Sequence, residues 1–461
     1  MSQSVELKNV ITRRASRRAF VGGALAAVGT SAVLSAGVQA QATPEATPAA
    51  AGNAAGDGPY LFVGDRAQTT VAVYAIPGFE LAGQLDGVTF GTHGGSLLLP
   101  NGRLIFADTT NEEIVAVTVD AAGVPSISQR VAADLGGGVA WIAASPTFSH
   151  VAIGSLQDSE TSQFLNIVDL ATFENTSLEF ALNEPEELTA WLLNDPLNVY
   201  VAIGGQINSY LLDDLLAGDT EPLNTVEVEL GSHGGATDAA NARIFYTTAP
   251  GTGFEVLDVQ NGPAEYLTQI PWDVDGFTGG RNARPRVTHD GEHIFGLLTP
   301  GLDDPTLWAE TMITNHIANT VDLSAVRVEV GTGNFGYRWG MSDRYAIWAG
   351  YNADGGTVYL LDADASSETF GTATATMPVA TPTNAAVPGE DFTDKDTYAT
   401  AITADSRYGF VSINGDRIVK VFDLEQLSEI VEIPIELPLS GYDGFLAVIE
   451  TGVTPVDLWG R

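Results

Sequence analysis

The 461-residue chain contains no cysteine. This absence excludes disulfide bonds, iron–sulfur clusters held by cysteine, a covalently attached c-type haem and a lipid anchor on an N-terminal cysteine. No helical span long enough to anchor the chain follows the first forty residues. These absences exclude several classes of redox and membrane-anchored protein.

Basic residues are scarce. The chain has 58 acidic against 20 basic residues, a formal net charge of −38. Residues 1–42 hold one of the acids and five of the bases, so the remainder carries 57 acids against 15 bases, with Lys395 and Lys420 as its only lysines. Such a surface repels phosphate backbones, which excludes nucleic acid as a partner. The same charge favours solubility and attracts cations or a basic protein partner.

The N-terminus has the pattern of an export signal. A basic start and a small-residue apolar run end in Ala40-Gln41-Ala42, an A-x-A cleavage site. Ser16–Phe20, "SRRAF", matches the twin-arginine signature, which a receptor recognises. We therefore expect a signal peptide over 1–42 and a soluble periplasmic or extracellular protein. Residues 43–58, rich in Ala, Pro and Thr, predict a disordered linker before a single domain over 59–461.

An internal repeat indicates the architecture. "AWIAASPTFSHVAIGS" at Ala140–Ser155 returns fifty residues later, without a gap, as "AWLLNDPLNVYVAIGG" at Ala190–Gly205. Short β-branched segments alternate with Gly, Asn and Asp turns, and no helical period is present. Units of roughly 45–55 residues with four strands each are typical of propeller blades. We predict an all-β, eight-bladed β-propeller; seven blades is the alternative, because the units near Asp273 and Thr381 are long and irregular.

The two ends of the domain are predicted to share one blade. Seven units begin near Gly91, Gly136, Asn183, Gly231, Asp273, Gly331 and Thr381. Before them, "PYLFVGD" and "TVAVYAI" resemble second and third strands that lack a first strand. The tail segment "GFLAVIE" at Gly444–Glu450 can supply it. Pairing the N- and C-terminal strands closes the ring and removes exposed sheet edges.

The last unit carries a family resemblance. "TADSRYGFVSINGDRIVKVFDLEQLSEI" at Thr403–Ile430 resembles the repeat of YVTN-type β-propellers, in which a D-G-R-Y-like turn leads into two strands. The resemblance implies a seven- or eight-bladed propeller. It does not imply one function, because the family includes lactonases, surface-layer proteins and parts of redox enzymes.

A second repeat contains two of the six histidines. "GTHGGSLLLPNGRLIF" at Gly91–Phe106 and "GSHGGATDAANARIFY" at Gly231–Tyr246 place His93 and His233 in the same frame. The loop that leads into the first strand of a blade lies at the channel mouth, where glycines permit close backbone approach. Both imidazoles are therefore expected at the mouth or its rim. Either they bind a divalent metal such as zinc, or each one hydrogen-bonds loops of its own blade. The candidate metal ligands are His93, His233, Asp396 and Asp443.

Other side chains at the starts of blades are candidates for binding a small ligand. They are bulky or basic: Trp141, Trp191, Arg284, Arg286, Tyr337 and Arg338. No nucleophile elbow or phosphate-binding loop is present, and nothing marks a general base. We therefore expect a monomeric binding protein rather than an enzyme. The alternatives are a lactonase-like hydrolase, a propeller subunit of a redox enzyme and a non-catalytic interaction scaffold.

The chain is also similar to exported propellers of the zinc-carrying AztD type, through its predicted export, blade count, acidic surface and paired histidines. That resemblance implies zinc as the ligand, His93 and His233 among its ligands, and metal carriage as the role. The chain departs from it in one respect, because residues 43–58 contain no histidine and so form no His-rich flexible segment. The lack of this segment argues against metal transfer more than it argues against metal binding.

Overall fold

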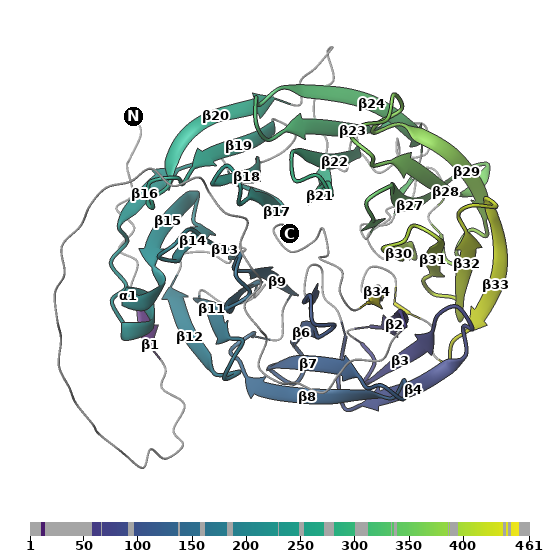
Figure 1. Cartoon of the computed structure of the whole chain (residues 1–461), viewed down its shortest axis with the longest axis horizontal. Helices are drawn as coiled ribbons and strands as arrows, with labels where there is room; N and C mark the ends of the chain where they lie inside the picture. The colour runs from purple at the N-terminus through teal and green to yellow at the C-terminus, as the bar shows by residue number, and fades with distance from the viewer. Residues whose placement is uncertain are drawn as a thin grey trace.

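The computed structural model describes residues 11–13, 58–65, 67–90, 96–136, 139–156, 162–181, 188–228, 230–248, 253–271, 281–299, 312–332, 334–335, 339–385, 387, 395–436, 439–440 and 444–450. Eight antiparallel sheets stand around a central axis, each with its first strand innermost and its fourth at the rim (Figure 1). The prediction of an eight-bladed propeller is confirmed, and the seven-bladed alternative is wrong.

The first four blades are numbered from the one that contains both ends of the domain. Blade 1 consists of β34 (Phe445–Ile449), β2 (Tyr60–Gly64), β3 (Thr70–Ala75) and β4 (Leu81–Asp86). Blade 2 consists of β5 (Ser96–Leu98), β6 (Leu104–Asp108), β7 (Glu113–Val119) and β8 (Pro125–Ala132). Blade 3 consists of β9 (Val139–Ala144), β10 (His150–Leu156), β11 (Ser162–Asp169) and β12 (Asn175–Ala181), and β1 (Ile11–Arg13) pairs with its outer edge. Blade 4 consists of β13 (Thr189–Leu193), β14 (Asn198–Ile203), β15 (Gln206–Leu211) and β16 (Asn224–Glu227), with the short helix α1 (Leu212–Ala217) before β16.

The remaining four blades follow in chain order. Blade 5 consists of β17 (Leu230–Asp238), β18 (Arg243–Thr248), β19 (Gly253–Asp258) and β20 (Glu265–Pro271). Blade 6 consists of β21 (Arg281–Val287), β22 (His293–Thr299), β23 (Met312–Asn319) and β24 (Ala325–Thr332). In blade 7, β25 (Asn334–Phe335) and β26 (Gly340–Met341) both pair with β27 (Tyr345–Asn352), and β28 (Gly355–Asp362) and β29 (Ala373–Val379) follow. Blade 8 consists of β30 (Tyr398–Ile402), β31 (Tyr408–Ile413), β32 (Ile418–Asp423) and β33 (Ser428–Pro434).

This up-and-down strand order gives the ring two distinct faces. The mouth face carries the loops that lead into first strands and the turns between second and third strands. The turn face carries the turns between first and second strands and between third and fourth strands. Inner strands such as β13 and β14 are buried along their whole length because neighbouring blades cover both of their sides. Outer strands such as β8 alternate between exposed and partly buried residues, as expected where one side faces water.

Both ends of the domain close the ring in one blade, as predicted. β34 pairs antiparallel with β2, from Tyr60 opposite Ile449 to Gly64 opposite Phe445. The carboxylate of Asp65, which is 0% exposed, accepts hydrogen bonds from the Ser440 amide at 2.5 Å and the Ser440 hydroxyl at 2.7 Å. The loop before the last strand is thereby fixed to the end of β2.

The arginine that recurs in the second sequence repeat connects neighbouring blades. Arg103 of blade 2 donates through Nη2 to the Leu170 carbonyl of blade 3 at 3.1 Å. Arg243 of blade 5 donates through Nη1 to the carbonyls of Thr320 and Val321 in blade 6. In both cases the arginine follows a turn between first and second strands, and its acceptor lies in a turn between third and fourth strands. The repetition therefore preserves a contact between blades.

Among the residues that the structure describes, no helix is long and apolar enough to cross a membrane.

Candidate functional site

The structure describes the sequence-predicted site residues to different extents. His93, Tyr337, Arg338 and Asp443 lie outside the described residues. His233 and Arg284 lie in the first strands β17 and β21, and only their backbone is described. The side chains that can be placed are those of Trp141, Trp191, Arg286 and Asp396. The binding roles of all ten residues remain predictions.

The candidate metal ligands belong to different blades by their place in the chain. His93 precedes β5 of blade 2, His233 lies within β17 of blade 5, and Asp396 precedes β30 of blade 8. Two or three steps around the ring separate each of these positions from the next. One ion shared by all three residues would therefore have to lie near the channel axis. Ligation at the rim would instead give separate sites.

His233 does not precede the inner strand, as the sequence suggested, but lies inside it. β17 begins at Leu230, and its register with β18 shifts between Leu230 and Gly235. Gly235 has the expected architectural role, because a Cβ there would lie 2.5 Å from the Phe245 carbonyl oxygen and 2.8 Å from Cζ2 of Trp191. The backbone of blade 5 can approach blade 4 this closely only at a glycine.

Asp396 lies on the mouth face beside a second carboxylate. It is half-buried, and its backbone carbonyl accepts a hydrogen bond from the Tyr351 hydroxyl at 3.1 Å. Asp416, in the turn between β31 and β32, accepts a hydrogen bond from the Thr383 hydroxyl at 2.6 Å. Burial, and then the negative charge of Asp416, raise the pKa of Asp396 above its ordinary value, while a hydrogen bond from Asn384 and the charge of Lys395 act against the rise.

This pair of carboxylates has the chemistry of part of a cation site. Two carboxylates that repel each other are stabilised by a divalent ion between them, and carboxylate oxygen is an accepted zinc ligand. Within the described residues, however, no group of three or more His, Asp or Glu side chains is arranged to hold a metal. The two carboxylates therefore fit part of a metal site. The other ligands of such a site would have to come from side chains that the structure does not describe.

Two of the candidate ligand-binding aromatics are buried. Trp141 and Trp191 are 3% and 1% exposed. Trp191 packs edge-on against Tyr246 of blade 5, with ring centroids 5.4 Å apart. This position gives Trp191 a packing role between blades.

Arg286 is also buried, at 4% exposed. Its Nη2 donates to the Trp339 carbonyl at 3.3 Å, and its guanidinium carbon lies 5.9 Å from the centre of the Trp339 ring. Arg286 thus connects blade 6 to blade 7, and the stacking of a guanidinium on an aromatic ring adds to the contact.

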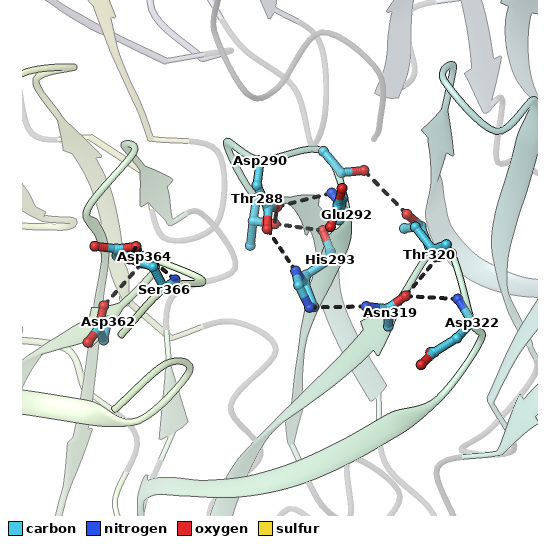
Figure 2. Close-up of polar contacts among 12 residues, drawn as sticks. Thr288, Asp290, Glu292, His293, Asn319, Thr320, Asp322, Asp362, Asp364 and Ser366 are labelled. Carbon is cyan, nitrogen blue, oxygen red and sulfur yellow. Dashed lines mark hydrogen bonds and ion pairs between the residues drawn. The ribbon is translucent and has the colours of Figure 1, made fainter. Parts of the chain in front are cut away.

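A histidine network that was not anticipated from the sequence lies on the turn face (Figure 2). His293, the first residue of β22, contacts Asp290 Oδ2 through Nδ1 at 2.9 Å and Asn319 Nδ2 through Nε2 at 3.3 Å. Asn319 Oδ1 accepts hydrogen bonds from the amides of Val321 and Asp322, which fixes the orientation of the Asn319 side chain. Nε2 is therefore the acceptor, and the imidazole proton lies on Nδ1.

This network is structural in character, because both ring nitrogens of His293 are engaged. Burial alone would raise the pKa of Asp290, but hydrogen bonds from His293, the Thr288 hydroxyl and the Glu292 amide outweigh it and lower that pKa to about 2. One signal in the sequence could have revealed the hydrogen bonds of this turn. Thr288 and Asp290 form the same hydroxyl-to-carboxylate contact as Thr403 and Asp405.

Comparisons with known proteins identify the fold. No family model matches this chain, and no curated protein matches it either. AztD from Citrobacter koseri has a similar structure, with a TM-score of 0.60 at 11% identity over 86% of this chain and 100% of AztD. The apo form of AztD from the same organism gives 0.57 at 12% identity over 86% of this chain and 99% of AztD. Dihydro-heme d1 dehydrogenase NirN in complex with DHE gives 0.56 at 14% identity over 85% of this chain and 75% of NirN. At such low identity these similarities show a shared β-propeller fold and no more.

Proposed function

We propose that this protein is an exported propeller that binds a divalent metal such as zinc at the channel mouth and carries it outside the cytoplasm. The observation that carries the proposal is the pair of carboxylates, Asp396 and Asp416, on the mouth face. Their mutual repulsion is the electrostatic setting that a bound cation relieves. The repeated Gly-His-Gly-Gly frame, which assigns His93 and His233 to the same face, supports it.

Two further features agree with metal carriage. The net charge of −38 attracts cations by long-range steering. The similarity in fold to AztD agrees with the zinc-carrier resemblance that the sequence suggested.

Zinc titration by calorimetry tests the proposal, together with metal analysis of protein purified from its native host. His93→Ala, His233→Ala and Asp396→Asn should each weaken zinc binding at least tenfold. His289→Ala, in an exposed turn on the opposite face, should leave binding unchanged. Affinity should also fall as the pH drops through about 6.5, because a protonated imidazole cannot bind a metal.

A different result is expected if the histidines do not bind zinc. If each histidine only hydrogen-bonds its own blade, His93→Ala and His233→Ala will lower the melting temperature without changing zinc affinity. A native protein that contains no bound metal, together with undetectable zinc binding in the titration, would refute the proposal.

A further inference from the structure

The strand that closes the ring is followed by a partly buried carboxylate. Glu450 follows β34 directly and lies on the turn face, opposite the mouth. Both of its oxygens accept a hydrogen bond from the same donor, the Ala404 amide, at 3.0 and 3.2 Å. Ala404 belongs to the turn between β30 and β31, so this contact joins the last strand to blade 8.

The same turn is fixed to blade 7. The Ser406 hydroxyl lies 2.8 Å from the Ser342 hydroxyl and donates to Asp343 Oδ1 at 3.1 Å. Ser342 and Asp343 lie between β26 and β27. Contacts therefore run from Glu450 through blade 8 to blade 7, and the position of the Glu450 carboxylate bears on three consecutive blades.

The surroundings of Glu450 favour its neutral form. The strands packed around β34 are β2, β30 and β31, with the sequences "YLFVG", "YATAI" and "YGFVSI", and their only titratable side chains are tyrosines. The nearby turn adds Asp405 and Arg407. The Arg407 guanidinium is directed elsewhere, over the Tyr408 ring and 3.8 Å from Asp423 Oδ2.

These surroundings change the acidity of Glu450 in a definite direction. Burial, and then the charge of Asp405, raise the pKa of Glu450 to about 7, while the hydrogen bond from Ala404 acts against the rise. An ionised Glu450 is thus partly desolvated beside a like charge, and it regains full hydration only when the strand opens.

We propose that Glu450 is a proton-operated latch on the ring-closing strand. When the carboxylate takes up one proton from solvent, β34 is held firmly against blade 8, and when it releases the proton, the strand loosens. The closed state therefore binds a proton that the open state does not, between the ordinary pKa of 4.5 and the raised value of about 7. Closure is strongest in mildly acidic surroundings and weakens towards pH 7.

Hydrogen exchange of the β34 amides in the full chain tests the latch, after correction for intrinsic exchange rates. The opening constant of β34 should rise about tenfold per pH unit between pH 5 and 7 and level off above pH 7. Glu450→Gln should give a constant value over this range. Glu436→Gln, at an exposed position after β33, should retain the wild-type curve.

A second variant keeps the test decisive if Glu450→Gln does not fold. Asp405→Asn removes the neighbouring charge, so the plateau should begin at a lower pH than in the wild type. The latch is overturned if the wild-type opening constant does not depend on pH, if Glu450→Gln keeps the wild-type curve, or if Asp405→Asn leaves the plateau in place.

Discussion

Replacing Asp65 by alanine should weaken the closure of the ring more than any comparable turn substitution. Asp65 is completely buried and accepts two hydrogen bonds from Ser440, which lies 375 residues further along the chain. A third bond, from the Ala67 amide at 2.5 Å, is local. Hydrogen bonds to a charged group contribute about 1.5–3 kcal/mol each. Loss of the two distant bonds should therefore cost about 3–6 kcal/mol.

Hydrogen exchange and thermal unfolding measure this effect. At about 1.4 kcal/mol per factor of ten, the β34 amides should exchange about two to four orders of magnitude faster in Asp65→Ala. Asp120→Ala is the matched control, because Asp120 accepts two backbone hydrogen bonds within its own exposed turn, from Ala122 and Val124. Equal β34 exchange in Asp65→Ala and Asp120→Ala would show that Asp65 does not hold the ring closed.

Two further predictions concern the turn face and the layers between blades. Because the pKa of Asp290 is lowered to about 2, its ionised form stabilises the fold above its ordinary value of 3.8, and this contribution is lost as the pH falls through about 2. Asp290→Asn should remove about 1–2 kcal/mol of that acid dependence, after allowance for solvent screening. Identical acid unfolding curves for both proteins would contradict the assignment. Gly235→Ala should lower stability by about 1–3 kcal/mol, because its Cβ would meet Trp191 and a backbone carbonyl. Gly58→Ala, whose Cβ would have ordinary contact at 3.7 Å, should melt as the wild type does.

Most of the architecture could be predicted from the sequence, because repeats and strand patterns are local signals. The shared blade could be deduced as well. Two strands near Tyr60 lacked a first strand, and one strand near Phe445 had no blade of its own. The position of His233 was harder to foresee, because β17 continues past the register shift between Leu230 and Gly235 and so includes the histidine.

The polar networks could not be predicted, because their members come together only through folding. Asn319 lies 26 residues beyond His293 and reaches it across one sheet. Phe370, which packs against the same imidazole with centroids 4.9 Å apart, comes from the next blade. Asp416 lies in a turn that approaches Asp396 only when blade 8 is formed. Such contacts cannot be deduced from spacing along the sequence. For this reason the predicted metal ligands did not include Asp416, and the hydrogen-bond network on the turn face was not predicted.

The shared blade also determines when the fold can be completed. Strand β2 is synthesised before the other seven blades and its partner β34 after them, so blade 1 has an open inner edge until all seven have been made. Bringing together two segments separated by 375 residues costs about 5 kcal/mol in chain entropy, which the seven intervening blades offset by forming first. The ring can therefore close only after β34 has been synthesised. The predicted twin-arginine leader fits this order of events, because that route exports proteins that have already folded.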